Sequence, residues 1–140
     1  MLHCPLPQIT ASLVRQWDIT LSKIDPQEDH VAALEICMMM GTNLLNAIFH
    51  KQGIRDEQYD QNHTDRPPIP QQAQAMITPD VRAMIDELHY IETMRNLYCR
   101  GITGNLTDAR DLPDWDPAVS VKCIGTIRKM QAFLDSMTRA

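Results

Sequence analysis

The chain has 140 residues, of which 44% are hydrophobic, and a formal net charge of -5. This length suits one hydrophobic core and is short for two, so we expect a single domain over residues 1–140. The acidic balance disfavours nucleic acid as a partner, because proteins that bind the phosphate backbone concentrate Lys and Arg on one surface. We find no apolar run near the roughly 20 residues of a membrane span and no secretory leader. The sequence therefore predicts a cytoplasmic protein without a membrane segment.

Three residue pairs mark the expected starts of helices: Asp25-Pro26, Thr78-Pro79 and Asp116-Pro117. The side-chain oxygens of Asp and Thr accept hydrogen bonds from the first turn of a helix, and a proline that follows lacks an N–H that would have no partner there. Gly53 and Gly101 follow the second and third apolar patterns, where a left-handed residue often ends a helix. These signals predict three helix starts and two helix ends.

Apolar residues that recur every three or four positions predict four helices, over about 9–24, 26–52, 79–100 and 117–137. The first and last show a single stripe, typical of a helix that buries one face. The second has a much wider apolar arc, so we expect it to be central, with Gly41 permitting close approach of its neighbours. The predicted fold class is all-α, an up-and-down four-helix bundle with a possible short extra helix in the long connection near residues 71–77.

The third predicted helix contains charges where its apolar stripe should continue. Counting on from Val81, Ile85 and Leu88, the same stripe meets Glu92, Arg95 and Cys99. Residues three apart on a helix can touch, so Glu92 and Arg95 can form an ion pair. One interpretation is a structural pair at a bundle edge or a dimer interface. The other is the polar floor of a small-ligand pocket between helices.

Arg82 and His89 stand on the same predicted helix with six residues between them. This spacing resembles the R-x4-6-H motif of HEPN domains, which are helical bundles that often have ribonuclease activity. Ala83 departs from the polar residue that usually follows the arginine. The resemblance implies an alternative function, a nucleotide- or RNA-related role that uses Arg82 and His89.

A second alternative is a metal-dependent bundle enzyme. Asp86, His89 and Glu92 are spaced by one helical turn, and Glu35 lies on the second predicted helix. Di-metal bundles hold their ions with such carboxylates and imidazoles, yet the Glu-x-x-His pairs of that class are missing. The four cysteines form no C-x-x-C pair and fit reduced, buried thiols. We therefore assign no metal site and no cofactor from the sequence.

The leading functional hypothesis is a non-enzymatic interaction or small-ligand-binding module, because neither a nucleophile elbow nor a phosphate-binding glycine loop occurs. The candidate ligand-binding residues are Glu92, Arg95, His89 and Arg82. A homodimer is expected because apolar residues such as Ile19, Ile36 and Met39 exceed what the stripes need. Trp115 lies in a connection, where we expect it to fold back over apolar surface.

Overall fold

A computed structural model describes residues 8–54, 69, 71–99 and 114–139 of the protein. Within these ranges the structure is all-α and contains no strand, as predicted. The helices are α1 (Gln8–Leu21), α2 (His30–Gln52), α3 (Gln71–Gln74), α4 (Pro79–Cys99) and α5 (Pro117–Arg139). The short α3 lies in the long connection where an extra helix was expected.

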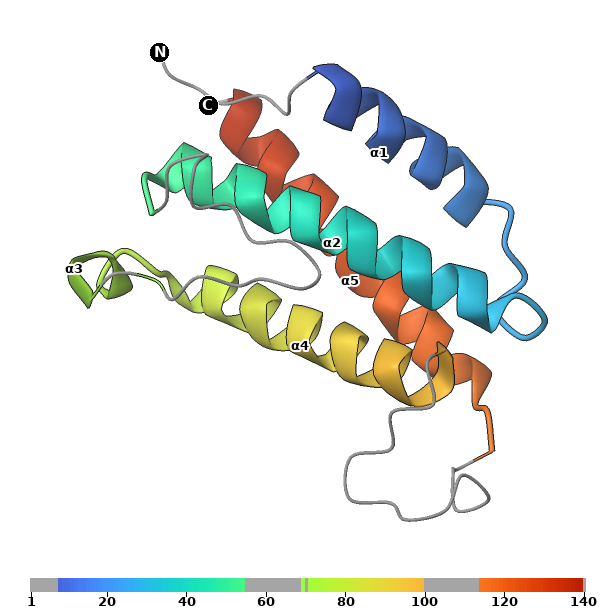
Figure 1. Cartoon of the computed structure of the whole chain (residues 1–140). Coiled ribbons are helices and arrows are strands. Elements are labelled where there is room, and N and C mark those ends of the chain that lie inside the picture. The colour runs from blue at the N-terminus through green and yellow to red at the C-terminus, as the bar shows by residue number, and fades with distance from the viewer. Residues whose placement is uncertain (1–7, 55–68, 70, 100–113, 140) are drawn as a thin grey trace.

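The second long helix, α2, is the centre of the structure. It packs mainly against α5 and α4 and less extensively against α1, and α4 also contacts α5. Successive long helices run in opposite directions, with α1 on the outside (Figure 1). The wide apolar arc of α2 is explained by these three neighbours, because a helix that touches one partner needs only a narrow stripe.

Two of the three predicted helix starts are confirmed. The Thr78 hydroxyl oxygen accepts a hydrogen bond from the Val81 N–H at 3.3 Å, and α4 begins at the proline between them. Asp116 Oδ1 accepts from the Ala118 N–H at 2.9 Å at the start of α5. Gly53 ends α2 with a φ of 71°, the left-handed conformation that glycine adopts without strain. Gly101 lies outside the described residues.

The third predicted start is wrong, since α2 begins at His30 and not at Pro26. Asp25 instead closes a separate turn: its Oδ1 accepts from the Gln27 N–H at 2.9 Å, and its carbonyl accepts from the Asp29 N–H at 2.8 Å. The Asp29 carboxylate in turn accepts from the Asp25 N–H at 3.1 Å, and it makes no capping bond to α2. The Asp-Pro chemistry is therefore used by a turn that precedes the helix.

Close packing in the middle of the molecule depends on Gly41 of α2. A Cβ atom added there would lie 2.7 Å from Leu88 Cδ1 of α4 and 3.3 Å from Ile127 Cδ1 of α5. Glycine in a helix costs about 1 kcal/mol relative to alanine. The cost is offset because three helices approach one another at this point, as the sequence predicted.

The buried face of α4 differs from the predicted one. Its buried residues are Val81, Met84, Leu88, Ile91 and Arg95, which alternate by three and four. The predicted stripe ran through Ile85 and Glu92, and both are only half-buried. Either set satisfies the helical period, and the packing of α4 against α2 and α5 selects the first. The sequence left open whether Arg95 faces inward, and the structure shows that it is buried.

The outer helix α1 is shorter than predicted, because it ends at Leu21 rather than Ile24. It buries Val14 and Leu21, whereas Leu13 of the predicted stripe is 46% exposed. Arg128 of α5 pairs with Asp18 of α1, so a polar contact also holds this helix. In α5 the predicted stripe is confirmed by its fully buried members Cys123, Ile127 and Met130.

One helix of the described chain, α2, is long and apolar enough to cross a membrane by length and composition alone. Its best 18-residue window has a mean hydropathy of 1.5, and 67% of that window is buried inside the protein. The expectation that no apolar run reaches this length was therefore too strict. Mostly buried helices of this kind occur as core helices of soluble proteins.

Candidate functional site

Three aromatic rings meet at the end of the molecule where α2 begins and α4 ends. The Trp115 indole, just before α5, stacks on the His30 ring with centroids 4.3 Å apart. The Tyr98 ring of α4 meets the same indole edge-on at 4.9 Å. Trp115 thus folds back over the helices, as expected for a tryptophan in a connection.

A buried arginine lies one helical turn before Tyr98. Arg95 is 5% exposed, and its Nε atom lies 3.7 Å from Oε1 of Glu35 on α2. The predicted pair of Arg95 with Glu92 is replaced by this pair between helices. A distance of 3.7 Å is too long for a hydrogen bond, so the two groups interact by charge alone. The Glu35 side chain is 27% exposed and keeps contact with water.

Buried polar atoms at this end have no hydrogen-bond partner among the described residues. They are Arg95 Nε, Trp115 Nε1 and His30 Nδ1, and Ser120 Oγ in the first turn of α5 is a further one. A buried donor or acceptor without a partner costs about 1–3 kcal/mol, and such atoms are rare in native proteins. We call Arg95, Trp115 and His30, with Glu35 and Tyr98, the Arg95 site.

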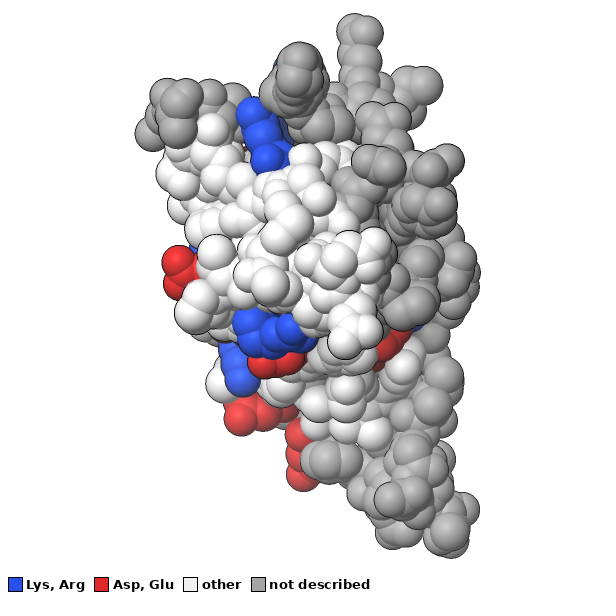
Figure 2. Space-filling view, turned by 90° about the vertical axis from the view of Figure 1, so that its left-hand side faces the viewer, with Lys and Arg blue, Asp and Glu red and all other residues white. Residues whose placement is uncertain are grey.

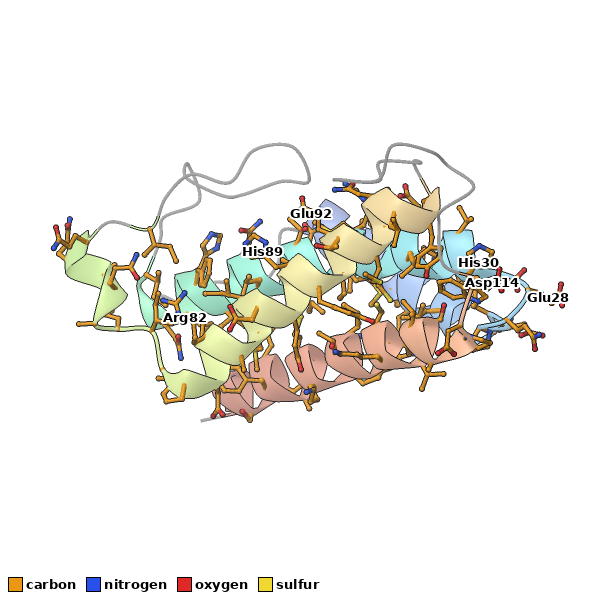
Figure 3. The ribbon with its side chains drawn as sticks, turned by 90° about the horizontal axis from the view of Figure 1, so that it is seen from below. Glu28, His30, Arg82, His89, Glu92 and Asp114 are labelled. Atoms are coloured by element: carbon orange, nitrogen blue, oxygen red, sulfur yellow. The ribbon has the colours of Figure 1, made fainter. Side chains whose placement is uncertain are left out.

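The other sequence-predicted site residues lie along α4. Figure 3 shows Arg82 towards one end of the molecule, His89 and Glu92 nearer the middle, and His30 beside Asp114 at the opposite end. Arg82 and His89 are exposed, and Arg82 Nη2 donates to Gln74 Oε1 at 3.3 Å. Seven residues of helix separate the two side chains by about 10 Å along the axis. The structure therefore does not bring Arg82 and His89 together with Arg95.

The residues of the metal alternative are not gathered into a ligand set. Asp86 and His89 are exposed and Glu92 is half-buried on α4. Across the described residues, no group of three or more His, Cys, Asp or Glu side chains could hold a metal ion. Nothing in this part of the chain supports the metal-dependent alternative.

The described cysteines are not joined in disulfides. Cys37 of α2 and Cys123 of α5 are fully buried, and burial raises the pKa of both thiols, that of Cys123 to about 12. Reactivity requires the thiolate, so these two groups are poor nucleophiles near neutral pH. Cys99 lies at the Arg95 site, where its Sγ is 3.8 Å from the Val31 carbonyl oxygen.

A shallow groove of about 340 Å³ runs between α4 and α5, away from the Arg95 site. Met84 and Phe133 line it, and the ion pair between Lys129 Nζ and Glu87 Oε1, 2.8 Å long, lies at its border. The end of the molecule that faces the viewer in Figure 2 carries a broad patch without charged side chains. The charged side chains that line the groove are Asp80, Glu87 and Lys129, and the last two are paired with each other.

Comparisons with known protein families, with curated proteins and with solved structures found no match to this chain. The resemblance to the HEPN motif therefore gains no support from them. Sequence reasoning identified Arg95 but missed His30 and Tyr98 as its neighbours. A tryptophan beside a helix start was the available signal, yet the rings that it would contact depend on how the helices pack.

Proposed function

We propose that this protein is a non-enzymatic module that binds a small ligand at the Arg95 site. The observation that carries the proposal is the buried guanidinium of Arg95, whose Nε–H lacks an acceptor among the described residues. Proteins retain so unfavourable a group where a function uses it, and local violations of packing rules concentrate at functional sites. Small-molecule sites also combine aromatic side chains with a few polar groups, and aromatic rings and unpartnered polar atoms occur together at this end of the molecule.

The described residues offer little for catalysis. The two buried thiols, Cys37 and Cys123, stay protonated because burial raises the pKa of each. His89, the shared residue of both enzymatic alternatives, is exposed and two helical turns from Arg82. A binding role therefore fits the geometry better than a reaction.

The proposal includes the architecture and the assembly. The alternating directions of α1, α2, α4 and α5 support an up-and-down four-helix bundle, and the burial of α2 supports a core helix of a soluble protein. The cytoplasmic location is part of the proposal and rests on the sequence alone. A homodimer is supported by Ile19 and Met39, which are 46% and 38% exposed. Light scattering coupled to size exclusion tests this assembly, and a monomer mass at micromolar concentration would contradict it.

A thermal-shift screen against a library of metabolites tests the binding function. A ligand at 100 times its Kd stabilises the native state by about 2.7 kcal/mol, so binders raise the unfolding temperature. We expect at least one compound to stabilise the wild type and to lose its effect in Arg95→Met. Arg82→Met is the matched control, since it removes an exposed arginine from the same helix. The proposal fails if no compound stabilises the protein, or if stabilisation survives Arg95→Met.

A further inference from the structure

The chemistry of the unpartnered atoms restricts what the Arg95 site can bind. Arg95 Nε and Trp115 Nε1 are buried and without partners among the described residues. Both carry N–H groups that can only donate a hydrogen bond, while His30 Nδ1 donates or accepts according to its tautomer. The missing partner must therefore offer acceptor atoms, and oxygen is the acceptor that fits two N–H donors best.

The donors come from separate parts of the chain that lie at the same end of the molecule. Trp115 stacks on His30 and meets the Tyr98 ring edge-on, and Tyr98 follows Arg95 by one helical turn. The Cys99 thiol lies 3.8 Å from the Val31 carbonyl, so the last turn of α4 and the first turn of α2 touch here. The site is thus built from α2, α4 and the residue before α5.

Charge selects among the possible acceptors. The positive charge of Arg95 is opposed by Glu35 at 3.7 Å, without a hydrogen bond to Nε. An anionic oxygen would form a charge-assisted hydrogen bond there, about twice as strong as one to a neutral carbonyl. Asp114 precedes Trp115 in the chain and lies at the same end of the molecule as His30 in Figure 3. It opposes an anion, but it is exposed and its field is weakened by solvent.

We infer that the ligand of the Arg95 site carries an oxyanion, a carboxylate or a phosphate group, whose oxygens accept the N–H groups of Arg95 and Trp115. This inference rests on the proposed binding function. The donor atoms are covered in the present conformation, so the Trp115 ring must turn aside to admit the ligand. Glu35 competes with the bound anion for the guanidinium.

Nuclear magnetic resonance of the two tryptophan indole N–H groups provides a direct test. Sodium acetate and sodium phosphate serve as probes for the two anion sources, each compared with sodium chloride at the same ionic strength. We expect acetate, phosphate or both to shift the Trp115 signal in a saturable manner. The Trp17 signal, from α1, is the internal control and should not move.

Variants should change the Kd of the probe in both directions, and a misfolded variant could not bind more tightly than the wild type. Arg95→Met should raise the Kd of the probe at least about tenfold, because a charged hydrogen bond is lost. Trp115→Phe keeps a ring but loses a neutral donor, which corresponds to about a fivefold weaker Kd. Glu35→Gln removes the competing charge and should tighten binding, whereas Arg82→Met should leave the Kd within about twofold.

The outcomes separate this inference from the proposed function. A neutral metabolite that binds in an Arg95-dependent manner would overturn the oxyanion inference and leave the binding function intact. Failure of every compound in the library, together with silent acetate and phosphate titrations, would overturn both. Weaker binding of both anions to Glu35→Gln than to the wild type would also overturn the inference, since it would make Glu35 a partner of the ligand.

Discussion

The pairing of α2 with α4 contains two regions of opposite character. In the middle, Gly41 lets Leu88 approach closely, and the surrounding side chains are apolar and buried. At the end, Arg95 faces Glu35 beyond hydrogen-bond distance, one helical turn before Tyr98, whose ring meets Trp115. The same two helices therefore form a dry, close-packed contact over one stretch and an incompletely satisfied polar contact two turns further on.

This difference separates what holds the fold from what is available for binding. In the close-packed region, dispersion and the hydrophobic effect stabilise the fold, and no space is left in which a ligand could make further contacts. Unpartnered donors do the opposite, because they lower the stability of the free protein and raise its affinity for a group that satisfies them. Substitutions in the two regions should consequently affect stability in different ways.

The largest expected effect is that of Ile91→Ala in the close-packed region. Ile91 is fully buried, and truncation of such a residue removes hydrophobic contacts and leaves a cavity. We expect the free energy of unfolding to fall by about 3 kcal/mol in urea denaturation. Glu92→Ala, one residue on but half-buried, should cost under about 1 kcal/mol. Equal losses in the two variants would contradict the orientation of α4.

A second variant adds side-chain atoms to the same close-packed region. Gly41→Val places atoms where Leu88 Cδ1 and Ile127 Cδ1 already lie, so the three helices must move apart. We expect a loss of about 2 kcal/mol in the free energy of unfolding. Gly125→Val is the matched control on α5, because nothing lies within 4 Å of an added Cβ there. The free energy of unfolding of Gly125→Val should differ from that of the wild type by less than about 0.5 kcal/mol. If Gly41→Val also unfolds with the wild-type free energy, the contact at Gly41 is loose.

Local patterns predicted the long helices well, because their spacing and their proline starts act within a few residues. The incorrect predictions have one cause, which is that a single local pattern is compatible with two structures. The Asp25-Pro26 pair closes a turn through the Gln27 N–H, a bond that resembles a helix cap, so the sequence cannot distinguish the two uses. Met84 and Ile85 are adjacent apolar residues, and only the packing of three helices decides which of them is buried.

The candidate site was predicted in part for the same reason. The count along α4 placed Glu92 and Arg95 on the continuation of the apolar stripe and left open whether they face inward, and only Arg95 is buried. Its partner depends on how α4 is positioned along α2, and this register brings Glu35 rather than Glu92 to the guanidinium. The rings of His30 and Tyr98 come from different helices, so no periodicity in one segment could have assigned both to Trp115.

Alkaline pH tests how dry the contact between α2 and α5 is. Burial raises the pKa of Cys123 to about 12 and raises that of Cys37, with the neighbouring Cys123 thiol adding to it. An unfolded thiol has a pKa of about 8.5, so the unfolded chain loses protons first and stability falls as pH rises above that value. Between pH 7.5 and 9 the two thiols together should account for about 1.5 kcal/mol.

Urea denaturation at both pH values measures this loss. The variant with Cys37→Ala and Cys123→Ala is less stable at each pH, and its stability should depend much less on pH. Burial also raises the pKa of Tyr90, so Tyr90→Phe tests whether this tyrosine contributes to any pH dependence that remains in the double variant. The same slope in the wild type and the double variant would mean that water reaches the thiols.

The smallest change in stability is expected at the Arg95 site itself. Arg95→Met removes a buried charge and its unpartnered donor, and methionine fills a similar volume. Removal of one member of a buried ion pair usually costs 3–5 kcal/mol, because the other charge stays buried. Glu35, however, is 27% exposed and can be hydrated. We therefore expect a change within about 1 kcal/mol of the wild type in urea denaturation, of either sign. A loss above about 2 kcal/mol would make Arg95 a structural residue, and the contrast with Ile91, one turn away on the same buried face, would then disappear.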